Sequence, residues 1–280
     1  MANTPSPLLR LPTELRDCIY RYALYCDNNG LQYRYWKTKA DGKPIFHATG
    51  KFKEDPRSWN QMQYVCRQLH AETKALELKY NPLIFRQTAT WELAVWSQFS
   101  KFAKALPMSK LAWLRTITLS TNSNAVRDVW GPRFVSRELP SIISISRFCD
   151  RHPQITCNYI IPLFTIHDRF EDEGLPMVPD VVRFMEEGVY INRVLRDKDV
   201  AFLIYASMSD HFDNEAKILR KGREVHEYQA SNLSFWPELR TFDEEGFRKW
   251  AIRGEYLWNA LEGGMEVWVN HAKDWIEKGI

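Results

Sequence analysis

Few side chains in this sequence have the types and spacing needed for chemistry, and the densest group is Cys149, His152 and Cys157. Thiolate and imidazole are preferred ligands of Zn²⁺, so this group is the natural place to look for a metal. Its spacing fits no standard zinc pattern, and a fourth ligand would have to come from His167 or from elsewhere. We therefore expect these residues to be structural, and we predict no metal site.

A second candidate is the acidic stretch at residues 167–179, which carries four carboxylates: Asp168, Glu171, Asp172 and Glu173. Paired carboxylates can perform acid–base catalysis or bind a cation, but an exposed acidic loop is far commoner. The sequence contains no GxxxxGK[ST], GxGxxG, HExxH or GxSxG motif, and no local signature marks a Cys–His nucleophile pair. We predict no catalytic residue and no cofactor, with an enzyme of unrecognised type as an alternative.

The composition is that of an ordinary globular protein. The chain has 280 residues, of which 45% are hydrophobic and 26% charged. With 38 basic and 35 acidic residues, the charge is too balanced to suggest a nucleic-acid surface. The five cysteines, an odd number, suggest a reducing compartment, and no stretch has the length of a membrane helix or the pattern of a secretory signal. We expect a cytoplasmic or nuclear protein without membrane contact.

The element that organises the N-terminal region is a predicted helix within residues 8–25. Its apolar side chains recur at intervals of three and four residues, which places them on one side of a helix: Leu15, Ile19, Tyr22, Ala23 and Cys26. Glu14 near the start and Arg21 near the end complement the helix dipole. The pattern predicts the helix, but it leaves open whether this apolar side is internal core or an exposed docking surface.

The next segments predict a hairpin and a second helix. Residues 31–36 and 44–48 are the hairpin strands, separated by the turn signal Asp41-Gly42. Residues 56–80 predict one long core helix, capped by Asp55 and ended by Asn81-Pro82. Its apolar side contains Trp59, Met62, Val65, Cys66, Leu69, Thr73 and Leu76.

Predicted helices and strands then alternate: helices at residues 91–106, 139–151 and 179–196, and strands at residues 83–85, 114–119, 156–161 and 200–205. Such alternation favours crossover units and a mainly parallel sheet, and the absence of sequence self-similarity favours this over a solenoid. Two C-terminal helical segments, rich in Trp, meet at Gly263-Gly264. We predict an α/β fold with an N-terminal region at residues 1–86 and a helix–strand body with C-terminal helices at residues 87–280.

Two segments carry a family resemblance. Residues 11–24 match the pattern LPxELRxxIYxxAL, and residues 65–72 match VCRQxxAE, followed by Tyr80, Asn81 and Phe85 as a YxxNxF-like strand entry. In this order the two segments resemble the F-box-like proteins expanded in filamentous fungi. The resemblance covers about a fifth of the chain.

The resemblance implies a protein–protein interaction module without a catalytic centre. In F-box proteins the LPxEL helix docks on the adaptor subunit of a cullin-RING ubiquitin ligase, and the downstream domain holds a substrate. This implies an adaptor contact at Leu11, Pro12, Leu15 and Ile19. A stand-alone regulatory or oligomeric protein, in which the same helix is internal core, is the alternative.

The second predicted helix also carries charged residues beside its apolar side. Charged groups in such positions are usually paired. We therefore expect Glu72 to accept hydrogen bonds from an arginine, either Arg16 or Arg67.

Overall fold

The computed structural model describes residues 6–27, 30–34, 45–48, 59–88, 92–121, 134–161, 185, 187–196, 198, 229–238, 240–253 and 264–280. The chain forms two compact units. Unit 1 contains Met1–Arg86 and Ser97–Leu119, and unit 2 contains Gln87–Trp96 and Ser120–Ile280. The sequence analysis divided the chain after residue 86. In the structure a later segment, Ser97–Leu119, also belongs to unit 1.

One six-stranded sheet orders its strands β2-β1-β3-β4-β5-β6. The strands are β1 Leu31–Arg34, β2 Ile45–Ala48, β3 Leu83–Gln87, β4 Thr116–Thr121, β5 Thr156–Ile161 and β6 Leu233–Pro237. Strands β1 and β2 pair antiparallel, as the predicted hairpin requires, whereas β1 pairs parallel with β3 and β5 pairs parallel with β6. The predicted fold class, α/β with a mainly parallel sheet and C-terminal helices, is confirmed.

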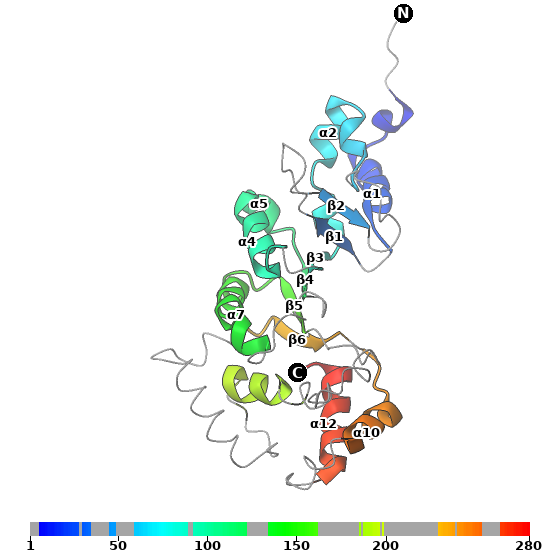
Figure 1. The fold of residues 1–280 in the computed structure, drawn as a ribbon. Helices are drawn as coiled ribbons and strands as arrows, with labels where there is room; N and C mark the ends of the chain where they lie inside the picture. Colours follow the sequence, from blue (N-terminus) through cyan, green and yellow to red (C-terminus); the bar gives the residue numbers. More distant parts are fainter. Residues whose placement is uncertain are drawn as a thin grey trace, which may run out of the picture. The chain divides into compact units, whose positions relative to one another are not determined.

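Unit 1 begins with the short 3-10 helix η1, Pro7–Arg10, and helix α1, Thr13–Leu24. After the hairpin come η2 at Met62–Tyr64, α2 at Arg67–Thr73 and α3 at Glu77–Tyr80, all before β3. Helices α4, Val95–Ala105, and α5, Met108–Leu111, then lead to β4. Figure 1 shows α1 and α2 in blue and cyan near the first strands, with α4 and α5 in green-blue.

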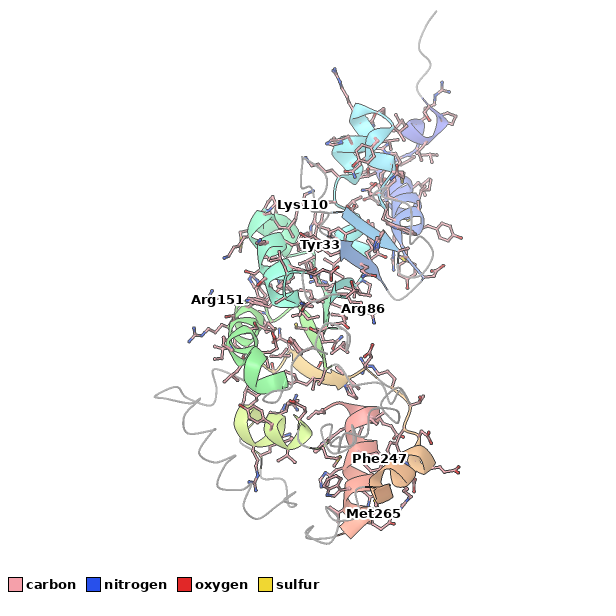
Figure 2. The ribbon with its side chains drawn as sticks, viewed as in Figure 1. Tyr33, Arg86, Lys110, Arg151, Phe247 and Met265 are labelled. Carbon is pink, nitrogen blue, oxygen red and sulfur yellow. The ribbon has the colours of Figure 1, made fainter. Side chains whose placement is uncertain are left out.

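An aromatic cluster forms the core between the first strands and α4. Tyr33 of β1 stacks at 4.8 Å from Phe85 of β3, and Phe46 of β2 lies 5.2 Å from Phe102 of α4, measured between ring centroids. Phe99 adds an edge contact to Phe85 at 5.2 Å. Tyr33 lies opposite Phe46 in β2 and opposite Phe85 in β3, so the strand register places the three rings on one face of the sheet. Tyr33 is labelled in Figure 2.

The single long helix predicted at residues 56–80 is wrong for the described residues 59–80. Cys66 has an extended backbone and caps α2 through its sulfur, which accepts from the Leu69 amide. Ala75 has φ 65 and separates α2 from α3. Asn60, fully buried, donates to the Thr73 carbonyl and to the Glu77 carboxylate, each at 2.7 Å, so these tertiary bonds replace a continuous helix. A helical period in the sequence cannot reveal such bonds.

Unit 2 contains α7 at Phe134–Arg151, a π-helical turn at Ile191–Leu195, α10 at Glu244–Arg253 and α12 at Gly264–Lys278. The two C-terminal helices are joined by an ion pair in which Arg248 bonds Glu266 at 2.6 and 2.8 Å. Trp268 and Trp275 of α12 are buried, as expected for core tryptophans. Strand β6 was not predicted, because it lies at the end of a long polar stretch, residues 217–236, to which the sequence pattern assigned no element.

Several predicted segments lie outside the described residues. These are the strand at residues 200–205, the acidic stretch at residues 167–179, and the first residues of the helices predicted to start at residues 56, 91 and 179. The predicted helix at residues 139–151 is longer at its start, since α7 begins at Phe134.

Candidate functional site: the exposed face of the first helix

Helix α1 has two apolar faces, and only one of them is covered. Tyr20 and Leu24 are fully buried and pack with Leu69 of α2. On the other side Leu15 is 53% exposed, Ile19 39% and Tyr22 89%. With about 100° of rotation per residue, these side chains lie roughly opposite Tyr20 and Leu24.

We call the exposed set the α1 stripe: Leu15, Cys18, Ile19 and Tyr22. Cys18 is exposed and completes the spacing of three and four residues. The apolar side predicted from the sequence included Leu15, Ile19 and Tyr22 but not Cys18. Cys18 lies three residues after Leu15, and this spacing could have assigned it to the same side of the helix. A continuous apolar stripe left in solvent is typical of a protein contact surface.

The segment before α1 is buried in part and exposed in part. Leu8 and Leu9 are partly buried and pack against the cluster of Tyr20, Leu24 and Leu69. Leu11 is half-buried, and Pro12 is exposed and takes the N-cap position of α1. Of the four expected contact residues, three are therefore exposed and Leu11 is partly covered.

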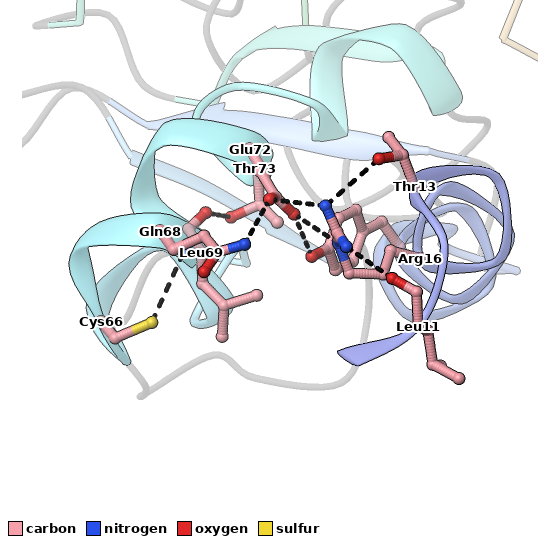
Figure 3. Close-up of polar contacts among 9 residues, drawn as sticks. Leu11, Thr13, Arg16, Cys66, Gln68, Leu69, Glu72 and Thr73 are labelled. Carbon is pink, nitrogen blue, oxygen red and sulfur yellow. Dashed lines mark hydrogen bonds and ion pairs between the residues drawn. The ribbon is translucent and has the colours of Figure 1, made fainter. Parts of the chain in front are cut away.

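A polar cluster fixes α1 against α2 from the side opposite the stripe (Figure 3). Arg16 donates to both oxygens of Glu72, each bond 2.9 Å long, in a bidentate pair. The hydroxyl of Tyr20 donates to Glu72 at 2.6 Å, and the amide of Gln68 donates at 2.9 Å. Arg16 also donates to the Leu11 carbonyl at 2.6 Å, which ties the lead-in to the helix.

The arginine that pairs with Glu72 is therefore Arg16. Arg67, the other candidate, lies exposed in the first turn of α2. The roles of Tyr20 and Gln68 were missed, because the sequence gives no sign that a tyrosine on one helix faces a carboxylate 52 residues later.

These bonds shift the ionisation of their members. Hydrogen bonds from Tyr20 and Gln68, together with the Arg16 charge, lower the pKa of Glu72 from 4.5 to about 2. Burial, with the bond to the Glu72 carboxylate, raises the pKa of Tyr20 to about 12. Over the neutral range Glu72 is thus an anion and Tyr20 a neutral donor, which is the state in which every bond of the cluster can form.

The end of α1 is held by a buried asparagine from the loop before β3. The side-chain amide of Asn81 donates to the carbonyls of Leu24 and Glu77 at 2.7 and 2.9 Å, and its oxygen accepts from the Cys26 amide at 2.7 Å. The indole of Trp59 also donates to the Leu24 carbonyl at 2.9 Å. Carbonyls at a helix end lack partners within the helix, so these donors fix where α1 stops.

The group Cys149, His152 and Cys157, which was considered as a metal site, lies in unit 2. Cys149 and Cys157 are both buried, and a hydrogen bond with Cys149, together with burial, raises the pKa of the Cys157 thiol. His152 packs on Phe148, with 4.5 Å between the ring centroids. In the part of the chain that the structure describes, no three His, Cys, Asp or Glu side chains gather as they would around a metal ion.

The described helices include none that is both long enough and apolar enough to cross a membrane. Searches against protein-family models, curated proteins and solved structures found no match to this chain.

Proposed function

We propose that this protein is a protein–protein interaction module that docks through the α1 stripe. The observation that carries the proposal is the exposure of Leu15, Ile19 and Tyr22 on a helix whose other face is fixed by Tyr20, Leu24 and the Arg16–Glu72 pair. A helix that is anchored on one side and apolar on the other presents a rigid surface for a partner.

The distribution of exposed apolar side chains supports the same unit. Among the described residues, the large hydrophobic side chains left in solvent all belong to unit 1: Leu15, Ile19, Tyr22, Tyr25, Tyr64, Val65 and Met108. The α1 stripe holds three of them in one row. A partner that covers these side chains would remove their remaining apolar surface from water, which favours binding.

We propose that the partner of this protein is the adaptor subunit of a cullin-RING ubiquitin ligase, and that the protein acts as a substrate receptor of that ligase. This rests on the resemblance of residues 11–24 and 65–72 to F-box-like proteins. A full F-box is a three-helix unit, whereas the hairpin β1–β2 follows α1 here, so we assign the adaptor contact to α1 with Leu11 and Pro12. The exposed fractions of Leu15 and Ile19, 53% and 39%, support docking over the stand-alone alternative, in which this helix is internal core.

The test is binding of the purified adaptor to the full chain and to Leu15→Asp and Ile19→Asp. Each change places a charge within the stripe and should weaken binding at least tenfold, a loss of about 1.4 kcal/mol or more. The matched control is Asp17→Lys, an exposed change on α1 outside the stripe, which should alter affinity less than about threefold. Circular dichroism melting confirms that each variant is folded.

Two results would contradict the adaptor proposal. One is the absence of binding by the wild-type chain at about 10 μM adaptor, well above the range of a specific contact of this kind. The other is a wild-type dimer in solution that Leu15→Asp converts to a monomer, because the stripe would then be occupied by a second copy of this chain.

A further inference from the structure

A second surface of unit 1 gathers basic side chains around α5. Between Ser97 and Leu119 the sequence has four basic residues and no acidic residue. Lys104, at the end of α4, and Arg115, after α5, are exposed, and Met108 at the start of α5 is 72% exposed. Lys104, Lys110 and Arg115 thus lie within seven residues of the exposed Met108 along the chain.

Contact between α5 and the end of α2 adds a further lysine. The ammonium group of Lys110 donates to the backbone carbonyl of Lys74 at 2.5 Å and lies 5.2 Å from the centroid of the Trp113 ring. The side chain of Lys74 is exposed. We call the set Lys74, Lys104, Met108, Lys110 and Arg115 the α5 surface; Figure 2 labels Lys110 on it.

The acidic side chains of the described segments 59–88 and 97–119 do not neutralise this surface. Glu72 is bound by Arg16 and Tyr20 on the α1 side, and Glu77 is buried and accepts from Asn60. Burial and the charge of Lys74 lower the pKa of Lys110, while Glu77 acts in the opposite direction. Glu77 thus offsets part of the charge of Lys110 only, and the exposed Lys74, Lys104 and Arg115 remain to attract anionic groups.

We propose that the α5 surface binds an acidic protein segment in which an apolar side chain lies between carboxylates. Three of its four cations are lysines, which act as compact charges for separate carboxylates. The exposed Met108, at the start of the same short helix, offers a flexible apolar contact. Single-stranded nucleic acid would instead need open aromatic faces for stacking, and Lys110 lies over the ring of Trp113. The inference uses different residues from the α1 stripe and stands whether or not α1 docks on an adaptor.

The experiment measures binding of a labelled peptide with one leucine between two runs of three glutamates, using the full chain. A peptide of glutamates alone and a single-stranded oligonucleotide of similar charge are compared with it. The variants are the double change Lys104→Glu with Arg115→Glu, and Met108→Ala. The control is Arg67→Glu, an exposed charge reversal at the opposite end of α2, about 10 Å along the helix from Lys74.

We expect saturable binding of the leucine peptide that weakens steeply between about 20 mM and about 200 mM salt. The double variant should bind it about tenfold more weakly, and Arg67→Glu should change it less than about threefold. Met108→Ala should weaken the leucine peptide more than the all-glutamate peptide. The inference is overturned if the oligonucleotide binds more tightly than the leucine peptide, if the double variant binds like the wild type, or if the peptide shows no saturation.

Discussion

Glu72→Gln tests the contact that holds α1 against α2. The change keeps the size of the side chain and an oxygen that can accept from Tyr20, but it removes the negative charge opposite Arg16. The Arg16 side chain is only 11% exposed, so its guanidinium would lose its charged partner in a poorly solvated place. We therefore expect a loss of stability in unit 1 and a looser position of α1.

The size of the loss follows from the pKa of Glu72. Lowering that pKa from 4.5 to about 2 corresponds to about 3 kcal/mol between the ionised and protonated forms. The Glu72 side chain is still 24% exposed, and screening by solvent reduces the useful part. We expect Glu72→Gln to lower the free energy of unfolding by about 1 to 2 kcal/mol at neutral pH.

The loss should depend on pH in a defined direction. The pKa of Glu72 is lower in the folded chain than in the unfolded chain, so its contribution is complete above about pH 4.5 and disappears as the pH falls toward about 2. The wild type should therefore approach the stability of Glu72→Gln over this range. At neutral pH the difference between the two should be constant.

Urea unfolding followed by circular dichroism measures both effects, with Glu14→Gln as the matched control. Glu14 lies exposed in the first turn of α1, where the same chemical change should cost about 0.5 kcal/mol or less. The reasoning is refuted if Glu72→Gln costs no more than Glu14→Gln, or if the difference between wild type and Glu72→Gln stays the same at pH values near the lowered pKa.

Two further changes test the same unit. Asn81→Ala removes two buried hydrogen bonds at the end of α1 and one to Glu77 of α3, and it should cost about 2 to 4 kcal/mol in urea unfolding; a cost below about 1 kcal/mol would show that the Leu24 and Cys26 groups find other partners. Ala75→Gly should raise stability by about 0.5 to 1 kcal/mol, because Ala75 has φ 65 at the position after the α2 cap, where glycine is preferred. A lower melting temperature for Ala75→Gly would contradict this account.

Local patterns predicted the elements whose stability is mostly local. The period of three and four residues identified α1, and period-two alternation with a turn signal identified the hairpin β1–β2. Alternation of helices and strands predicted a mainly parallel sheet as a class. It did not predict that β1 pairs with β3 or β5 with β6, since the order of strands depends on contacts distant in sequence.

The same reasoning failed where long-range polar contacts decide the backbone. The helix predicted for residues 56–80 is divided by the extended Cys66 and by Ala75, and the buried amide of Asn60 bonds groups on both α2 and α3. Apolar periodicity measures only which residues share a side of a continuous helix. It does not take account of a side-chain amide that donates hydrogen bonds to a carbonyl and a carboxylate elsewhere in the chain.

The sequence by itself predicted a helix within residues 8–25, with Leu15, Ile19 and Tyr22 on its apolar side, and an arginine partner for Glu72. The tertiary structure decided that the partner is Arg16, that Tyr20 and Leu24 are the covered side chains, and that the α1 stripe is left in solvent. The physical reason is that helix periodicity fixes the direction in which each side chain points from the helix axis, whereas burial depends on which other elements pack on that side of the helix. Helix α2 packs on the Tyr20 side of α1. The opposite side, which we propose for docking, is therefore left exposed.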